Sequence, residues 1–593
     1  MITEEDVRAA VGVLTVPALL RRNAGEYGHL PALTGADERT WTWRELCDQV
    51  LSVAGGLRAL GLRRGERMLI GMSSRPEHWV ADLAAVELGA IPCTTYATLS
   101  PEQIRQVAVH SAATVVVLEG AAELARWAPA LAEMPALKGV VVVEDVDGGH
   151  TRYADLLAAE PAPPDAEAGQ DDPVTMIYTS GTTGDPKGVV LSHHNVLYQC
   201  ALQELVQPAP AHPRTVAYLP LAHIAERVLG IYLPLYTAGH VTVCPDATRL
   251  LATLTEVRPQ AFFGVPRVWE KFAAGLQQLL AGDRRAAVGR ARELAAEAYR
   301  IRAAGDALPG ELAEALEHAD REVLRPLRER IGLAEAARLG SGAAPIPAQV
   351  LEFFGSLGMT IMEVWGLSET TGAATSTFPD NYRAGTVGLP MPGMEVRLAA
   401  DGEIEVRGPL VFLGYLRPDG GIQAAVDADG WLPTGDLGAF DADGPLRIID
   451  RKKEMIITSS GKNIAPSAVE SLLRAHPLIG YAVVVGDRRP YLTALLMLDA
   501  EAAPAWAAAR GLAATELKEL AAEPPVLDEL AAAVRRANEA LSRPEQVKVF
   551  RVLDHAWSPA SGELTPSLKL RRRVIEQRYA GMIEELYAEG SGS

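Results

Sequence analysis

The chain has 593 residues, more than one hydrophobic core organises, and this length predicts several folding units. Hydrophobic residues make up 48% and charged residues 22%, a balance typical of soluble globular domains that excludes collagen-like and wholly disordered proteins. A formal net charge of −19 argues against a general nucleic-acid or anionic-membrane surface. We therefore expect no nucleic-acid partner, and any polyanionic ligand must meet positive charge supplied locally.

The cysteines and the hydropathy pattern indicate the compartment. Cys47, Cys93, Cys200 and Cys244 lie far apart without the spacing of a metal site, which favours free thiols in a reducing cytoplasm. The N-terminal residues lack a basic region followed by an apolar run, and no apolar stretch reaches the about 18 residues of a membrane span. We expect a cytoplasmic protein without a transmembrane segment; peripheral membrane contact is left open.

Short apolar segments rich in β-branched residues alternate with Ala-rich helical segments in the first half of the chain. The expected strands lie at 67–72, 114–120, 139–145, 174–180, 215–220, 240–245 and 261–266. Strands that alternate with helices indicate βαβ units and a largely parallel sheet with helices on its faces. The predicted fold class is therefore α/β.

The residue composition and its periodicity change twice further along the chain. Between about 276 and 339, Ala, Arg, Glu and Leu recur at helical spacing, which predicts a helical insertion. Its arginines are typical of a solvated helix face, because Glu293 and Glu297 lie among them; a membrane-facing or partner-facing stripe is the weaker alternative. From Gly393, short alternating segments with Asp-Gly turns predict a β-rich unit that joins the final segment at Asp450.

Lysine usage is the most informative count in the sequence. Only 9 of the 56 basic residues are lysines, so the chain uses arginine wherever a generic positive charge serves. Five lysines fall in three short stretches rich in Gly, Thr or Arg: Lys187, Lys452, Lys453, Lys462 and Lys569. A compact ammonium contacts phosphate oxygens as a point charge, a role that the planar guanidinium does not reproduce.

The stretch from Tyr178 to Gly188, YTSGTTGDPKG, directly follows an expected strand. Its glycines let the backbone approach a ligand, and its hydroxyls and successive N–H groups suit phosphate oxygens. It is not a P-loop, because Pro186 rather than glycine precedes Lys187. An ordinary turn is the alternative, but a run this dense in Ser, Thr and Gly favours phosphate binding.

YTSGTTGDPKG resembles the phosphate-binding signature of the adenylate-forming superfamily, which includes acyl-CoA ligases, luciferases and peptide-synthetase adenylation domains. Further stretches agree with that family in order and spacing, at 219–227, 264–271, 341–346, 364–372, 430–438, 450–466 and 564–573. LPLAHIAER, GVPRVWEK and the helical insertion resemble the long-chain fatty acyl-CoA ligase branch. The likeness runs from about Thr15 to about Val574.

The resemblance implies a reaction and a domain plan. Such enzymes join a carboxylate to the α-phosphate of ATP, release pyrophosphate, and then turn a small C-terminal domain so that CoA attacks the acyl-AMP. The chain is thus expected to be an acyl-CoA ligase for a hydrophobic acid that uses ATP, Mg²⁺ and CoA. The implied plan is an N-terminal AMP-binding domain at 1–449, of layered α/β subdomains plus the β-rich unit, and a small mobile α+β domain at 450–593.

The resemblance also implies roles for particular residues. Thr179 to Lys187 would hold the β- and γ-phosphates, with Thr179 and Glu369 near Mg²⁺, which favours oxygen ligands. Asp436 would accept hydrogen bonds from the ribose hydroxyls, with Arg451 beside it.

Three further residues have implied roles in catalysis. Lys569 would bridge the acid and the α-phosphate, Asp450 would be the hinge, and His223 would orient the acyl carboxylate and the thiol rather than titrate. The other residues that the resemblance places at the nucleotide or CoA are Ser180, Gly181, Thr182, Thr183, Gly184, Gly342, Ala343, Trp365, Gly366, Ser368, Thr370, Lys453 and Lys462.

Each of these residues also has a simpler explanation when taken singly. Asp436 suits a turn, Glu369 a helix start, and Lys569 a solvated basic run; a lone His223 is more often structural than catalytic. All of the motifs in order make coincidence a poor explanation.

The sequence departs from the family pattern at three points. Trp365 replaces the usual tyrosine that stacks on adenine, so we expect Trp365→Tyr to raise pyrophosphate release. Ser460 replaces a glycine in the loop after the hinge, near the expected path of CoA. Ala225 stands where the long-chain branch often has an aromatic residue, which favours a wider acid, polycyclic or branched.

Several alternatives stay open. The chain is also compatible with an enzyme of one half-reaction, which converts acyl-AMP from a partner adenylating enzyme or adenylates an acid for a separate carrier protein. A catalytically silent acyl-nucleotide-binding protein is the alternative from another class. The identity of the acid, the pathway and a dimeric state are not readable here, and the composition indicates a GC-rich, bacterial source.

Overall fold

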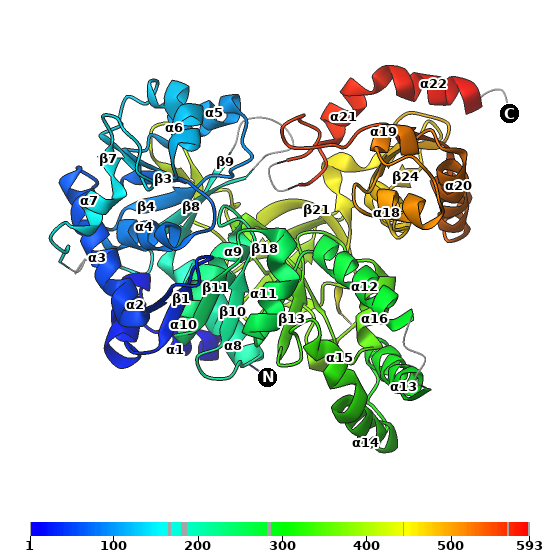
Figure 1. Cartoon of the computed structure of the whole chain (residues 1–593), viewed down its shortest axis with the longest axis horizontal. Helices are drawn as coiled ribbons and strands as arrows, with labels where there is room; N and C mark the ends of the chain where they lie inside the picture. Colours follow the sequence, from blue (N-terminus) through cyan, green and yellow to red (C-terminus); the bar gives the residue numbers. More distant parts are fainter. Residues whose placement is uncertain are drawn as a thin grey trace.

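The computed structural model describes residues 2–163, 168–179, 187–281, 286–442, 444–565 and 568–590. A large α/β part is followed by a smaller α+β part that lies beside it (Figure 1). This arrangement confirms the predicted fold class. Among the described residues, no helix combines the length and apolarity needed to cross a bilayer. All four cysteines are free and buried.

The first sheet is entirely parallel, in the order β4-β3-β5-β6-β7. Its strands are β3 (Arg67–Gly71), β4 (Ile91–Thr94), β5 (Val115–Leu118), β6 (Gly139–Val142) and β7 (Thr151–Arg152). Helices α3 (Trp43–Ala59), α4 (Pro76–Glu87), α5 (Pro101–Ser111), α6 (Ala121–Leu131) and α7 (Tyr153–Leu157) connect or flank these strands. Every residue of β4 and β5 is buried, as expected for a parallel sheet covered on both faces.

Two further sheets are mixed. One has the order β10-β11-β1-β2 and contains β1 (Pro31–Thr34), β2 (Thr40–Thr42), β10 (Arg214–Ala217) and β11 (His240–Val243). The other has the order β12-β13-β14-β15-β16 and contains β12 (Ala261–Gly264), β13 (Arg338–Ser341), β14 (Met362–Trp365), β15 (Thr375–Ser376) and β16 (Leu389–Pro390). The predicted strands β10, β11 and β12 pair in parallel with their neighbours, and each sheet also has antiparallel strands at one edge.

Helices fill the space around these sheets. Those not yet named are α1 (Glu4–Val11), α2 (Val16–Glu26), α8 (His193–Val206), α9 (Ile224–Glu226), the π-helix η1 (Arg227–Tyr232), α10 (Leu233–Thr237), η2 (Ala247–Arg249), α11 (Leu250–Val257), α16 (Ala348–Gly355), η4 (Ser368–Thr370) and η5 (Pro379–Asn381). Together with the sheets they enclose the main hydrophobic core, which includes Val50, Ile70, Leu197 and Tyr232.

The prediction of a parallel sheet was wrong for the strand expected at 174–180. This strand, β8 (Pro173–Thr179), pairs antiparallel with β9 (Lys187–Ser192), in a sheet of order β20-β19-β9-β8 with β19 (Gly414–Leu416) and β20 (Ile422–Gln423). The two strands follow one another in the chain with a short connection, and a short connection joins antiparallel rather than parallel neighbours. Thr179 and Lys187, near the two ends of the predicted phosphate-binding stretch, therefore lie opposite one another.

The region of the predicted helical insertion is helical, and its first helix begins before the expected start at about 276. Its helices are α12 (Pro266–Ala281), α13 (Ala286–Ala303), α14 (Gly310–Ala319), the π-helix η3 (Asp320–Leu324) and α15 (Arg325–Glu329). Pro266 occupies the first position of α12, where its missing N–H costs no hydrogen bond, so the helix starts directly after β12. Helices α13 and α14 project from the body of the molecule (Figure 1).

The β-rich unit is an antiparallel sheet of order β17-β18-β21-β22. Its strands are β17 (Glu395–Leu398), β18 (Glu403–Arg407), β21 (Leu432–Phe440) and β22 (Leu446–Arg451). Alternate residues of β21 are buried, which agrees with the alternating pattern in the sequence.

The smaller part contains a three-stranded sheet between two helical layers. Its strands are β25 (Ile479–Val485), β26 (Leu492–Leu498) and β27 (Val547–Leu553), preceded by η6 (Lys452–Glu454) and the short pair β23 (Ile456–Ile457) and β24 (Asn463–Ile464). Its helices are α17 (Pro466–Arg474), α18 (Ala502–Ala509), α19 (Leu517–Leu520), α20 (Pro524–Glu539), η7 (Arg543–Glu545), α21 (Arg572–Arg578) and α22 (Ala580–Gly590). Every residue of β26 is buried, because separate hydrophobic clusters cover the two faces of the sheet.

A fully buried ion pair joins α4 to the π-helix η1. The Arg227 guanidinium donates to both Asp82 carboxylate oxygens, at 2.9 and 2.7 Å, and also to the hydroxyls of Thr94 and Tyr232, each at 3.1 Å. Charges removed from water at this depth require such pairing. The pair therefore fixes the segment that directly follows the predicted site residue His223.

We expect Asp82→Ala to lower the free energy of unfolding by about 3–5 kcal/mol, because it leaves the Arg227 charge buried without a counter-ion. Thermal unfolding of the purified variant measures this loss. Glu317→Ala, which breaks an exposed pair with Arg321, is the control and should cost less than about 1 kcal/mol. Equal melting temperatures for the two variants would contradict the assignment.

Candidate active site

The hairpin of β8 and β9 positions two of the predicted phosphate ligands. Thr179 and Lys187 lie opposite one another, at the end of the hairpin where the chain passes from β8 to β9. Thr179 is half-buried and Lys187 is exposed. The other residues predicted for this loop, Ser180, Gly181, Thr182, Thr183 and Gly184, lie outside the described residues.

Tyr415 connects this hairpin to Glu369. It lies on β19, beside Val189 of β9, and its hydroxyl donates to Glu369 Oε1 at 2.8 Å. The Lys187 ammonium lies 4.7 Å from the centre of the Tyr415 ring, within cation–π distance. Burial and the neighbouring Glu369 carboxylate raise the pKa of Tyr415, so its hydroxyl stays a hydrogen-bond donor. Sequence analysis missed this residue, because no chemical motif marked it.

Glu369 and Thr179 form the donor set predicted for Mg²⁺. Glu369 lies in the turn η4, and its backbone carbonyl accepts from the N–H of Phe412 at 2.9 Å. Among the described residues, no group of three or more His, Cys, Asp or Glu side chains is placed to hold a metal. One carboxylate and one hydroxyl fit Mg²⁺, because this ion usually keeps water and nucleotide phosphates as its remaining ligands.

Asp436 lies at the centre of a second group of predicted site residues. It lies on β21 opposite Arg451 of β22, whose guanidinium contacts Asp436 Oδ1 at 2.7 Å. The indole N–H of Trp365 donates to Asp436 Oδ2 at 2.8 Å. Burial raises the pKa of Asp436, and Arg451, the Trp365 hydrogen bond and Lys569 act against that rise. Three predicted site residues are therefore in direct contact here.

Lys569 belongs to the smaller part, and its ammonium interacts electrostatically with Asp436 and Arg451. It follows Leu568, which has a φ of 61°, and its backbone carbonyl accepts from the N–H of Thr565 at 2.7 Å. The side chain is accessible to solvent, but protein groups surround its ammonium. This partial loss of hydration, together with Arg451, lowers the pKa of Lys569, while Asp436, Glu454 and Glu369 oppose the effect.

His223 lies at the N-terminus of α9, where Nδ1 accepts from the N–H of Ala225 at 3.2 Å. Burial and the positive charge of Lys569 lower the pKa of His223 to about 4. The imidazole is therefore neutral at physiological pH, which agrees with a role in orientation rather than titration.

Asp450, the predicted hinge, binds the backbone of two residues that follow it in the chain. One carboxylate oxygen accepts from the N–H of Arg451 at 2.7 Å, and the other accepts from the N–H of Ser467 at 2.9 Å. Ser467 belongs to the first turn of α17. Asp450 thus ties the end of β22 to the start of the smaller part in this arrangement.

A tight turn holds the predicted residues around 366–370. Gly366 has no room for a side chain, because a Cβ there would overlap the carbonyl oxygen of Gly372. Thr370 is fully buried, and its hydroxyl accepts from the N–H of Leu367 at 2.8 Å, so it stabilises the turn rather than facing a ligand. Ser368 is half-buried in the same turn.

The loop after β13 contains Gly342 and Ala343. A Cβ on Gly342 would lie 2.7 Å from Val364 Cγ2, so glycine lets the backbone pack against β14. Ala343 has a φ of 69°, a left-handed conformation that costs an alanine about 1 kcal/mol. Its side chain is exposed.

Lys453 and Lys462 are not brought into this cluster by any described contact; both are exposed on the smaller part. Their neighbour Lys452 binds Asp401 at 2.5 Å and Glu403 at 2.7 Å. A prediction that Lys453 and Lys462 contact CoA stays a prediction.

Ion pairs between α12 and the smaller part hold the two parts in this arrangement. Arg267 pairs with Asp499, and Lys271 pairs with Glu501 at 2.9 Å. Arg474 of α17 lies 3.4 Å from Glu270. Helix α12 belongs to the insertion, so the insertion contacts the same part that supplies Lys569.

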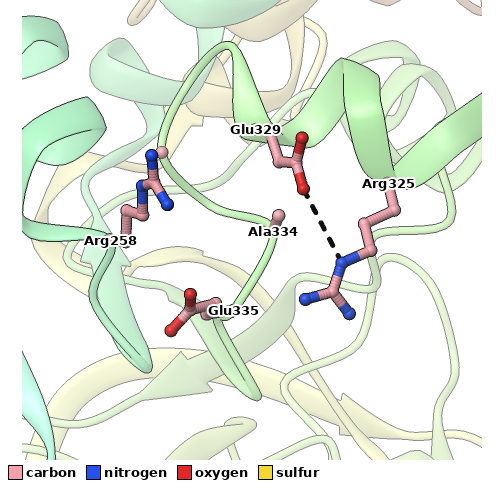
Figure 2. Close-up of a pocket in the computed structure, with 6 residues that line it drawn as sticks. Arg258, Arg325, Glu329, Ala334 and Glu335 are labelled. Atoms are coloured by element: carbon pink, nitrogen blue, oxygen red, sulfur yellow. Dashed lines mark ion pairs between the residues drawn. The ribbon is translucent and has the colours of Figure 1, made fainter.

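A separate small pocket lies beside α15 and the end of α11 (Figure 2). Three of its charged residues form ion pairs: Arg325 with Glu329 at 3.8 Å, and Glu335 with Arg214 at 2.7 Å. None of the predicted site residues lines it, so it is not part of the candidate site.

Comparison with known proteins agrees with this geometry. Residues 20–416 match the AMP-binding enzyme family, and residues 453–591 match the AMP-binding enzyme C-terminal domain. The long-chain-fatty-acid–CoA ligase FadD15 of Mycobacterium tuberculosis is 37% identical over 92% of each chain. The long-chain-fatty-acid–CoA ligase heimdall of Drosophila melanogaster is 31% identical over 97% of this chain and 95% of its own.

Solved structures share the fold. The o-succinylbenzoate CoA synthetase of Bacillus subtilis, in complex with its acyl-adenylate intermediate, superposes with a TM-score of 0.70. It covers 95% of this chain and 98% of its own at 22% identity, a likeness that concerns the fold alone. The match of both family models along the chain, in the order that the motifs predicted, establishes its kinship: the chain belongs to the AMP-binding enzyme family, as an ATP-dependent acyl-CoA synthetase of the long-chain fatty acyl-CoA ligase branch.

Proposed function

We propose that the chain activates a hydrophobic carboxylic acid as its acyl-AMP and then transfers the acyl group to CoA. One observation carries the proposal: the Lys569 ammonium lies within electrostatic reach of Asp436, Glu369 and His223, which come from distant parts of the chain. Asp436 is the proposed ribose ligand and Glu369 the proposed metal ligand. A cation that lies near both carboxylates and near a neutral imidazole suits the joining of a carboxylate to a phosphate.

In this proposal the chain positions ATP through charge and hydrogen bonds. Lys187 binds the terminal phosphates, and Asp436 accepts from the ribose hydroxyls. Glu369 and the Thr179 hydroxyl hold Mg²⁺, which supplies positive charge to the phosphate oxygens when bound.

Lys569 holds the acid carboxylate beside the α-phosphate. Its ammonium stabilises the negative charge that spreads over the α-phosphate as the carboxylate oxygen attacks and pyrophosphate leaves. Neutral His223 orients the acid without exchanging a proton with it. Burial lowers the pKa of Lys569, and its amine keeps N–H donors in either protonation state.

The arrangement of the two parts suits the first half-reaction, because Lys569 faces the other site residues. In the second half-reaction, residues 450–593 turn as a unit about Asp450 relative to residues 1–449 and withdraw Lys569. That turn breaks the pairs of α12 with Asp499 and Glu501. The proposed pivot is Asp450, which lies near the end of β22 and accepts a hydrogen bond from the first turn of α17.

The acid is proposed to be a long-chain fatty acid or a wider relative of one. FadD15 and heimdall, which the chain resembles over nearly its full length, are named long-chain-fatty-acid–CoA ligases. Ala225 is half-buried two residues after His223, and we expect its small side chain to leave room beside the acyl carboxylate. The sequence-based preference for a polycyclic or branched acid stays a prediction.

A panel of acids tests the function. With ATP, Mg²⁺ and CoA, we expect long-chain acids to give pyrophosphate and acyl-CoA, and short acids to give little of either. Reactions without acid are the control. Acyl-CoA formed only from supplied acyl-AMP would favour the half-reaction alternative, and no pyrophosphate with any acid would favour the catalytically silent one.

Removal of the Lys569 ammonium should separate the half-reactions. We expect Lys569→Ala to lower acid-dependent pyrophosphate release by about a hundredfold or more, because a charge-stabilising donor is lost. Conversion of supplied acyl-AMP and CoA to acyl-CoA should change little, since Lys569 has then left the site. Arg573→Ala, in the same basic run, is the matched control. Equal losses in both steps would contradict the role of Lys569.

Loss of the Tyr415 hydroxyl should weaken the metal site. We expect Tyr415→Phe to raise the Mg²⁺ concentration for half-maximal pyrophosphate release about fivefold, because Glu369 loses the hydrogen bond that orients it. Calorimetric titration of ATP at several Mg²⁺ concentrations checks the same shift without turnover. Tyr236→Phe, which removes a hydroxyl that binds the Ala10 carbonyl, is the matched control. An unchanged Mg²⁺ dependence would exclude this role.

A further inference from the structure

Trp365 makes a polar contact that its expected role as an adenine platform does not require. We propose that Trp365 is a positioning residue, whose indole N–H fixes the Asp436 carboxylate in the orientation that receives the ribose hydroxyls of ATP. The inference rests on the proposed ribose role of Asp436 and deepens it. It concerns a side chain at which this sequence departs from the family pattern.

The two donors to Asp436 take different oxygens. Trp365 Nε1 donates to Oδ2 at 2.8 Å, and Arg451 Nε lies 2.7 Å from Oδ1. Each carboxylate oxygen has two lone pairs, so one acceptor position on each stays available. A carboxylate held at both oxygens cannot rotate, and its remaining lone pairs then point in fixed directions.

The surroundings of the indole support a fixed donor. Trp365 is 8% exposed and packs into the main hydrophobic core. Its carbonyl accepts from the N–H of Ala374 at 2.8 Å, and the next residue, Gly366, is pressed against Gly372. A side chain this covered offers little ring surface to a stacked base. In this proposal the indole N–H therefore acts on the nucleotide through Asp436, to which it donates.

The two donors also differ in their attachment. Arg451 follows the predicted hinge and its side chain is 47% exposed, so its contact with Asp436 depends on where the smaller part lies. Trp365 belongs to β14 in the large part, as Asp436 belongs to β21. The indole bond therefore persists when the smaller part turns, and it keeps Asp436 oriented through both half-reactions.

Nucleotides without ribose hydroxyls separate the two roles of Trp365. If the indole acts through Asp436, its removal weakens ATP but has little effect on 2′,3′-dideoxy-ATP, which offers Asp436 nothing to bind. If the indole acts by stacking on adenine, both nucleotides lose the same factor, because both carry the base.

The experiment measures the dissociation constants of ATP and 2′,3′-dideoxy-ATP by calorimetry for the full chain and for Trp365→Phe, with pyrophosphate release as a second readout. We expect about a tenfold loss of ATP affinity and less than about a twofold loss for the dideoxy nucleotide. Trp431→Phe is the matched control, since Trp431 is equally buried and packs under Arg397 and Arg407, away from Asp436.

Trp365→Tyr is the second variant, because it keeps a large aromatic ring if Trp365→Phe does not fold. We expect the same selective loss for ATP, which is opposite to the gain that the sequence alone predicted for this variant. An equal loss for both nucleotides, or no loss for either, would overturn the inference.

Asp436→Asn distinguishes failure of the inference from failure of the proposed function. The full chain should prefer ATP over the dideoxy nucleotide, and Asp436→Asn should lose that preference. If the full chain shows no preference, the ribose role of Asp436 is wrong. If the full chain and Asp436→Asn behave as expected but the Trp365 variants keep the preference, the inference about Trp365 alone is wrong.

Discussion

The ion pair of Asp436 and Arg451 is the contact on which the geometry of the site depends. In this arrangement of the two parts, the two residues face one another across β21 and β22. Arg451 directly follows Asp450, whose carboxylate binds the first turn of α17. Asp436, the proposed ribose ligand, and the attachment of the smaller part therefore lie on one pair of strands. The smaller part, which starts there, places Lys569 near Asp436.

Buried ion pairs give each part the rigidity that such a site requires. Asp82 and Arg227 fix the segment after His223 in the large part, and Glu470 binds Arg572 at 2.7 and 2.9 Å in the smaller part. Arg572 lies three residues after Lys569, so the second pair anchors the loop that presents the ammonium. Both pairs cost desolvation and gain a unique geometry, which a wholly apolar contact does not impose. The turn that we propose between the half-reactions is then confined to the connection between the parts.

The sequence predicted the strands well and the pairing less well. β-branched runs located β3, β5, β6, β10, β11 and β12, because strand formation here follows local hydrophobic patterning. The antiparallel pairing of β8 with β9 follows from the short connection between them. In the sequence, that connection is interpreted as a ligand-binding motif and not as the turn of a hairpin. Motifs also named the residues that carry charge. They did not name Tyr415, because a tyrosine that orients two other residues leaves no signature in one sequence.

The hydrogen bond from Trp365 to Asp436 is a second feature that residue type and spacing do not reveal. Residue type alone presents tryptophan as a larger tyrosine without its oxygen, which suggests a weakened nucleotide site. The structure turns the ring so that its one donor meets Asp436, and a donor to a carboxylate is worth more than a stacking surface that is 8% exposed. What matters at this position is the direction of one N–H bond, which packing around β14 determines. Composition and spacing carry no record of that direction.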